Sequence, residues 1–140
     1  MKTLVFISVL LCALIFGSVS WKSTAAGDVQ KRKAVAEFSN PITVQGIVLQ
    51  GQYLFVHDDA AMNRGDACTF IYKGNAEVRD KLVTSFHCIH VERATVKNFT
   101  WRSREIAPGK LELVDFQFSG ETSAHGVPQP SNIAVVPIVN

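Results

Sequence analysis

The residues best suited to chemistry in this chain are its histidines and one nearby methionine. Imidazole, thiolate and thioether groups are the ligands that copper and zinc favour, so these side chains are the candidates for a metal site. The candidate set is His57, Met62, His87, His90 and His125. Its spacing matches neither a zinc-finger nor a blue-copper pattern, and a site would need neutral imidazoles from three separate segments of the chain.

The densest part of this set is the run His87-Cys88-Ile89-His90. Because side chains alternate between the two faces of a strand, Cys88 and His90 would point one way and His87 the other. The same alternation argues against His87 as a base that activates a Cys88 nucleophile. The sequence therefore predicts that the domain binds no transition metal specifically. A small copper or zinc protein is the alternative.

Cys68 and Cys88 are the cysteines that remain once an N-terminal signal sequence is removed. In an oxidising compartment such a pair is expected to form a disulfide. The predicted Cys68–Cys88 bridge would stabilise the domain by about 3 kcal/mol if it acts on the entropy of the unfolded chain. Free thiols and metal ligands are the other interpretations of these two residues.

The remaining motifs and the charge are less informative. Asp58 and Asp59 lack the alternating ligand spacing of a calcium loop and fit turn caps better. The basic run Lys31-Arg32-Lys33 is interpreted as a solvated tether, and a formal net charge of +2 provides no field that would attract nucleic acid. No nucleophile elbow, phosphate loop or His-Glu-x-x-His motif occurs. We therefore assign no catalytic residue and no cofactor, and a binding or structural module is favoured over an enzyme.

The first twenty residues are typical of a secretory signal peptide. Lys2 precedes an apolar run, Leu4 to Phe16, and small residues follow up to Ser20. Cleavage is expected between Ser20 and Ala26, which makes the mature protein secreted or periplasmic. An uncleaved anchor is the alternative, although a bilayer-spanning helix needs about 20 apolar residues and this run is shorter. No second apolar run follows, so the mature chain is expected to have no membrane span.

The elements that must position the candidate residues are strands. Short runs of β-branched and aromatic residues alternate with Gly, Asp and Asn clusters, and no window has a helical period over ten residues or more. The pattern predicts an all-β fold, an antiparallel sandwich or barrel of six to eight short strands. We expect a signal peptide at residues 1–20, a polar lead-in at 21–37, the β domain at 38–122 and a proline-containing tail at 123–140.

One part of the β domain, roughly residues 38–90, resembles small exported bacterial β-domain proteins of uncharacterised function. The residues that carry the resemblance are Pro41-Ile42-Thr43-Val44, Gly46, Leu49, Gly51, Tyr53 and Phe55, followed more loosely by Asp58-Asp59, Cys68 and Phe86-His87-Cys88. The resemblance implies a bacterial envelope or extracellular setting, with an envelope protein as a candidate partner. It carries no known activity, so it assigns no functional residue.

Overall fold

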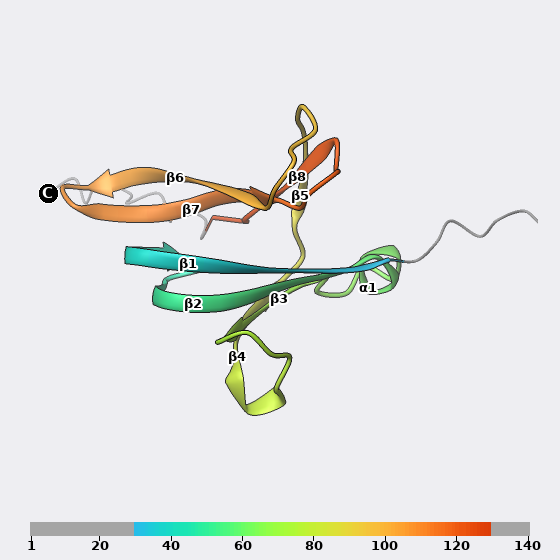
Figure 1. The fold of residues 1–140 in the computed structure, drawn as a ribbon, viewed down its shortest axis with the longest axis horizontal. Coiled ribbons are helices and arrows are strands. Elements are labelled where there is room, and N and C mark those ends of the chain that lie inside the picture. Colours follow the sequence, from blue (N-terminus) through green and yellow to red (C-terminus); the bar gives the residue numbers. More distant parts are fainter. Residues whose placement is uncertain (1–29, 130–140) are drawn as a thin grey trace, which may run out of the picture.

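The structure, a computed structural model, describes residues 30–129, and the expected signal peptide and cleavage region lie outside this range. Strands make up most of the described chain and α1 is a single short helix, which confirms the expected all-β class (Figure 1). The elements are β1 (Lys31–Val44), β2 (Ile47–Asp58), α1 (Asp59–Asn63), β3 (Thr69–Lys73), a 3-10 turn (Arg79–Lys81), β4 (Leu82–Phe86), β5 (Ile89–Glu92), β6 (Thr100–Ala107), β7 (Lys110–Gln117) and β8 (Ser123–Gly126).

The strands form one mixed sheet rather than a purely antiparallel sandwich or barrel. Their order is β4-β3-β2-β1-β7-β8-β5, and β6 pairs with β7 outside this path. The β1–β7 pairing is parallel, with Ile42 opposite Leu111, and the other pairings are antiparallel. Figure 1 shows that the sheet curls, so that β6 and β7 form a layer facing β1 and β2. The alternation within a strand predicts its two faces but not its neighbours, which is why the sequence did not reveal the parallel pair.

The two longest strands, β1 and β2, form a hairpin that supports the rest of the sheet. Its turn is Gln45-Gly46, and both residues have positive φ angles, 52° and 78°. Two-residue turns of this kind match the twist of the strands that they join, and glycine adopts the required conformation without steric cost. The ladder shifts register between Phe38 and Ile42, a segment that contains Pro41, which has no N–H to donate. β1 begins at Lys31, so it includes residues 31–37 of the expected lead-in.

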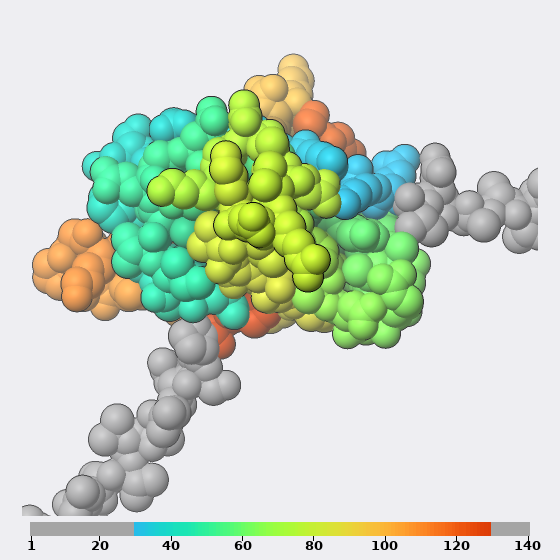
Figure 2. All heavy atoms as spheres, turned by 90° about the horizontal axis from the view of Figure 1, so that it is seen from below, coloured from blue at the N-terminus to red at the C-terminus, as the bar shows by residue number. Residues whose placement is uncertain are grey.

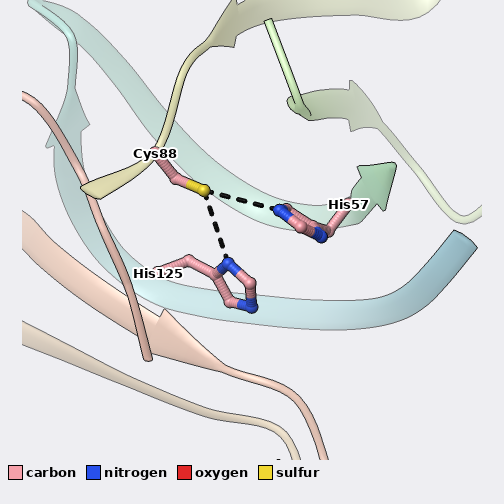
Figure 3. Close-up of side chains that lie close together, drawn as sticks. All are labelled: His57, Cys88 and His125. Atoms are coloured by element: carbon pink, nitrogen blue, oxygen red, sulfur yellow. Dashed lines mark hydrogen bonds between the residues drawn. The ribbon is translucent and has the colours of Figure 1, made fainter. Parts of the chain in front are cut away.

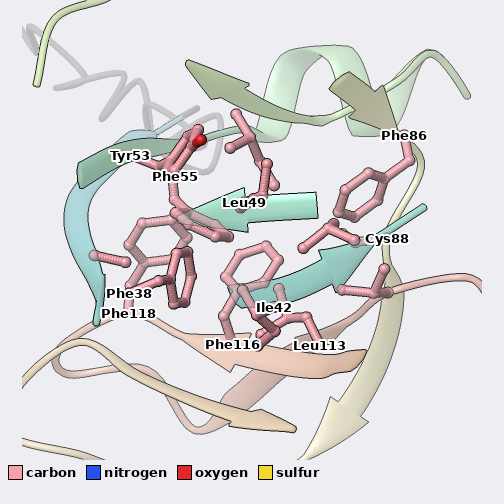
Figure 4. Close-up of a cluster of buried hydrophobic side chains, with 14 of the residues drawn as sticks. Phe38, Ile42, Leu49, Tyr53, Phe55, Phe86, Cys88, Leu113, Phe116 and Phe118 are labelled. Carbon is pink, nitrogen blue, oxygen red and sulfur yellow. The ribbon is translucent and has the colours of Figure 1, made fainter. Parts of the chain in front are cut away.

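The core lies between the hairpin and β7 (Figure 4). Phe55 of β2 is fully buried, and its ring centroid lies 5.0 Å from that of Phe116 in β7 and 5.4 Å from that of Phe99. On the opposite face of β2, Leu54 and Val56 are buried in a smaller cluster. Figure 2 shows the segment around β4 lying over this side of the hairpin. Both faces of β2 are therefore covered.

Replacing Phe55 with alanine should lower the free energy of unfolding by about 3–5 kcal/mol, because the side chain joins the two layers and its removal leaves a cavity. Urea denaturation of the mature, reduced protein would measure the loss. The matched control is Val48→Thr in the same strand, where the side chain is 63% exposed, and it should change stability by no more than about 0.5 kcal/mol. Similar small losses in both variants would contradict the packing described here.

Candidate metal centre

Three buried side chains from separate segments meet inside the curled sheet: His57 from the end of β2, Cys88 from the connection between β4 and β5, and His125 from β8 (Figure 3). They are 1%, 3% and 7% exposed. Sγ of Cys88 lies 3.4 Å from Nε2 of His57 and 3.4 Å from Nδ1 of His125. One potential ligand atom from each residue lies within 4.8 Å of the others, so the three can act as one site.

The sheet register places the two imidazoles beside each other. His125 pairs with Phe116 of β7, and its ring stacks on that of Phe116 with the centroids 5.2 Å apart. His57 pairs with Thr69 of β3, and its ring centroid lies 4.2 Å from that of His125. Because the neighbours of both rings belong to the buried core, the rings are held in place by packing as well as by polar contacts.

A carboxylate lies behind each imidazole, on the side away from the sulfur. Oε2 of Glu121 is 2.8 Å from Nε2 of His125, and Oδ1 of Asp59 is 3.1 Å from Nδ1 of His57. The second contact has the distance of an ion pair but not the direction of a hydrogen bond, since Nδ1 of His57 has no aligned partner among the described residues. Arg32 joins the two carboxylates, at 3.0 Å from Asp59 and 2.7 Å from Glu121.

These carboxylates determine where the imidazole protons lie. The hydrogen bond with Glu121 places the N–H of His125 at Nε2, and the negative charge of Asp59 favours the N–H of His57 at Nδ1 without an aligned hydrogen bond. In these tautomers the other nitrogen of each ring presents a lone pair to Cys88. A thiol has one hydrogen and can donate it to only one acceptor at a time. One buried acceptor is therefore left without a donor, and leaving such a group unsatisfied costs about 1–3 kcal/mol. A metal cation between the three atoms would accept both lone pairs.

Burial controls the charge of the two groups nearest the centre. It lowers the pKa of His57 to about 4, helped by the neighbouring His125, so the ring is neutral at pH 7, the form that binds metals. Burial, together with the hydrogen bond between Cys88 and Cys68, raises the pKa of the Cys88 thiol to about 12. Burial alone would raise the pKa of Glu121, but the hydrogen bond from His125 and the charge of Arg32 outweigh it, and the net shift is downward. Glu121 is thus a carboxylate and Cys88 a thiol in the metal-free protein.

The two sulfur–nitrogen separations fit a tetrahedral ion. Zinc lies about 2.3 Å from a thiolate sulfur and about 2.0–2.1 Å from an imidazole nitrogen, so a tetrahedral angle requires sulfur and nitrogen to be about 3.6 Å apart. The two observed separations, between Sγ of Cys88 and the nitrogens of His57 and His125, are 3.4 Å. At these lengths the corresponding angle is about 103°. The two sulfur–nitrogen separations therefore need shifts of only a few tenths of an ångström, whereas the two nitrogens, which lie within 4.8 Å of each other, must be about 3.3 Å apart at a tetrahedral angle.

A cavity of about 450 Å³ adjoins the three side chains. Met62 and His90 line it together with Arg32 and Glu121. Sites with three protein ligands and an open side differ from closed structural zinc sites, which use four protein ligands. Two histidines and a cysteine with a more distant methionine are also a ligand composition used by copper proteins. The cavity leaves room for a fourth ligand from the protein or from solution.

The structure divides the histidines and Met62 proposed from the sequence into three groups. His57 and His125 belong to the ligand group. Met62 and His90 line the adjoining cavity but do not belong to the ligand group. His87 is exposed, and its Nδ1 contacts the carbonyl oxygen of Asp66, 2.9 Å away. Of the residues that alternation was expected to divide between two faces, Cys88 belongs to the ligand group, and His87 and His90 do not.

Cys88, which the sequence predicts in a disulfide, lies at the centre of the ligand group and is not bonded to Cys68 in this structure. Both cysteines are free and buried, with their Sγ atoms 3.2 Å apart. Cys68 does not belong to the ligand group. The Cys68–Cys88 disulfide thus remains a prediction about the oxidised protein.

Sequence reasoning missed the residues that support the ligands. Asp59 lies two positions after His57, and Glu121 lies four before His125, so these spacings were the available signals. Arg32 gave no local signal, because it belongs to the basic run that we interpreted as a solvated tether. Its contacts with Asp59 and Glu121 depend on β1 lying beside β2 and close to the turn before β8.

Comparison with known proteins provides no independent assignment. The chain matches no protein-family model, no curated protein and no solved structure. Within residues 30–129, no helix has the length and apolar character needed to span a membrane. The interpretation of the centre therefore depends on its own geometry.

Acid should destabilise the metal-free, reduced protein through His57. The unfolded chain takes up a proton at this residue below about pH 6.5, whereas the folded chain does so only near pH 4. Stability is therefore lost as the pH falls through this interval, by up to about 3 kcal/mol. Urea denaturation between pH 7 and pH 4 should show the unfolding free energy of the wild type falling by that much more than that of His57→Asn.

His90→Asn is the matched control for the loss of an imidazole, because His90 is exposed on β5. This variant should follow the wild type over the same pH range. A difference between wild type and His57→Asn that does not change with pH would show that His57 is not buried in its neutral form.

Proposed function

We propose that this protein binds one copper or zinc ion through His57, Cys88 and His125. The observation that carries the proposal is the convergence of two imidazole nitrogens on one buried sulfur, each at 3.4 Å. Each imidazole is also backed by a carboxylate, an arrangement that commonly orients metal-binding histidines. Nitrogen and thiolate ligands select borderline-soft ions over calcium or magnesium, which prefer oxygen.

Charge balance favours an ion over a permanently metal-free core. With Cys88 as a thiolate, the formal charge of this residue together with Asp59, Glu121 and Arg32 is −2, since the one guanidinium offsets one of three negative groups. A divalent cation would neutralise the whole cluster. Without it, Cys88 must keep its proton, and two acceptor nitrogens share a single weak donor. A bound metal ion would neutralise the negative charge and would also accept the lone pairs of both nitrogens.

The role that we propose is binding, in an exported protein of the bacterial envelope or its surroundings. The support for export is the apolar N-terminal run that follows Lys2, and the support for the bacterial setting is the sequence resemblance over residues 38–90. Such a protein could store, carry or sense the ion. A non-enzymatic module that recognises an envelope partner, the function favoured by the sequence, is compatible with the same domain if the ion stabilises its fold.

Zinc titration of the reduced, mature protein should give one ion per chain with a Kd in the micromolar range or tighter. His57→Ala and His125→Ala should each weaken binding by at least about 100-fold, because removing a ligand should cost no less than removing a residue behind it. Asp59→Asn and Glu121→Gln should weaken it by about 10–100-fold. Competition with a chromophoric chelator would measure each affinity.

His87→Ala and His90→Ala are the matched controls, since neither residue belongs to the ligand group. Both should bind zinc within a few-fold of the wild type. Cobalt(II) provides a second readout, because a cysteine ligand produces a thiolate-to-metal charge-transfer band that surface histidines cannot give. Wild-type affinity in His57→Ala, or no such band in the wild type, would refute the proposal.

A further inference from the structure

Cys88 has a second sulfur as its neighbour. Its Sγ lies 3.2 Å from Sγ of Cys68, and its backbone N–H donates to the same Cys68 sulfur at 3.3 Å. The Cys68 N–H in turn donates to the carbonyl oxygen of Phe86, two residues before Cys88, at 3.1 Å. The two cysteines are thus held side by side by the backbone around β3 and β4, independently of any metal.

We propose that Cys88 belongs to two mutually exclusive states, as a thiolate ligand of the metal or as the disulfide partner of Cys68, so that thiol oxidation releases the metal. The inference depends on the proposed function, since it concerns the regulation of the same site. Its structural basis is that one sulfur contacts the two ligand nitrogens and the Cys68 sulfur.

The two states cannot coexist because both use the same sulfur. A disulfide bond is about 2.05 Å long, so its formation requires the two Sγ atoms to approach by about 1.2 Å. The bonded Cys88 sulfur would have no negative charge, and the thiolate is the form of cysteine that binds metals. The remaining ligands would be two neutral imidazoles, which cannot replace the charge or the third ligand atom.

The order of events follows from access to the two sulfurs. Cys88 lines the cavity, whereas Cys68 is fully buried and is not among the residues that line it. A small disulfide RSSR in the cavity would be attacked by the Cys88 sulfur after its thiol loses its proton, which forms a mixed disulfide and releases one RS⁻ that takes up a proton. The Cys68 thiolate would then attack the Cys88 sulfur and release the second RS⁻. Overall, two thiol hydrogens and two electrons pass from the protein to RSSR, which becomes two RSH.

Oxidation must then weaken metal binding by the same factor by which bound metal disfavours formation of the disulfide. If the disulfide weakens metal binding, the bound metal makes the cysteine pair correspondingly harder to oxidise, because the two equilibria share one thermodynamic cycle. Zinc is the informative ion, since it has no redox chemistry of its own that could oxidise the thiols directly. The site would thus hold its ion under reducing conditions and release it under oxidising ones.

The test uses the full mature chain equilibrated with reduced or oxidised glutathione, with and without zinc. Mass spectrometry reports the internal disulfide, and a chromophoric chelator reports bound zinc. We expect the oxidised protein to contain the Cys68–Cys88 bond and to bind no zinc at concentrations that saturate the reduced protein. Preloaded zinc should slow formation of the bond.

Cys68→Ala is the matched variant, because it removes the second sulfur but leaves the ligand group intact. In its reduced form it should bind zinc within a few-fold of the wild type. With oxidised glutathione it should accumulate a glutathione adduct on Cys88, which the wild type resolves to the internal bond. Loss of zinc binding in reduced Cys68→Ala would make Cys68 a ligand and overturn the inference.

The remaining outcomes separate this inference from the proposed function. If the reduced wild type binds zinc and the oxidised wild type binds it equally well, the redox inference is wrong and the metal site stands. If no internal disulfide forms under excess oxidised glutathione, the inference is again wrong. If the reduced wild type binds no zinc, the proposed function fails and the inference fails with it.

Discussion

Two buried imidazole lone pairs that face a single thiol are the constraint around which this structure is organised. Hydrogen-bond acceptors inside a protein are costly unless they are satisfied, and one S–H group cannot satisfy both nitrogens. The nearby carboxylates increase the constraint, because Glu121 accepts a hydrogen bond from His125 on the far side of its ring and the charge of Asp59 favours a proton on the far side of His57. A cation between the three ligand atoms would meet these requirements, and this is the physical basis of the metal site that we propose.

The curled sheet is what brings these groups together. His57, Cys88 and His125 are separated by 31 to 37 positions from their nearest partners in the cluster, so only long-range strand pairing can bring them together. The parallel contact of β1 with β7 joins the hairpin to the layer that carries β8. Aromatic packing, including Phe116 against both Phe55 and His125, then fixes the spacing between the layers. Core and centre share residues, so the stability of one depends on the other.

Local patterns in the sequence were enough to predict the fold class but not the architecture. The alternation of Val114, Phe116 and Phe118 with Asp115 and Gln117 predicts a strand, which β7 confirms, but Asp115 and Gln117 on the polar face are buried as well. The pairing of β1 with β7 depends on contacts between distant segments, which leave no periodic trace. For the site, residue chemistry identified His57 and His125 as candidates, but the same reasoning assigned Cys88 to a disulfide. That assignment came from the cysteine count and the expected export, which contain no information about the histidines that surround Cys88 in the connection before β5.

X-ray absorption at the zinc edge of the reduced, zinc-loaded mature protein would test the central claim most directly, because it reports the atoms bound to the ion. The account predicts one sulfur at about 2.3 Å and two imidazole nitrogens at about 2.0–2.1 Å, with any further ligand a light atom. The sulfur should disappear from the shell in a Cys88→Ser variant and remain in Cys68→Ala. A shell of oxygen and nitrogen alone in the wild type would contradict the assignment of this centre as a metal site.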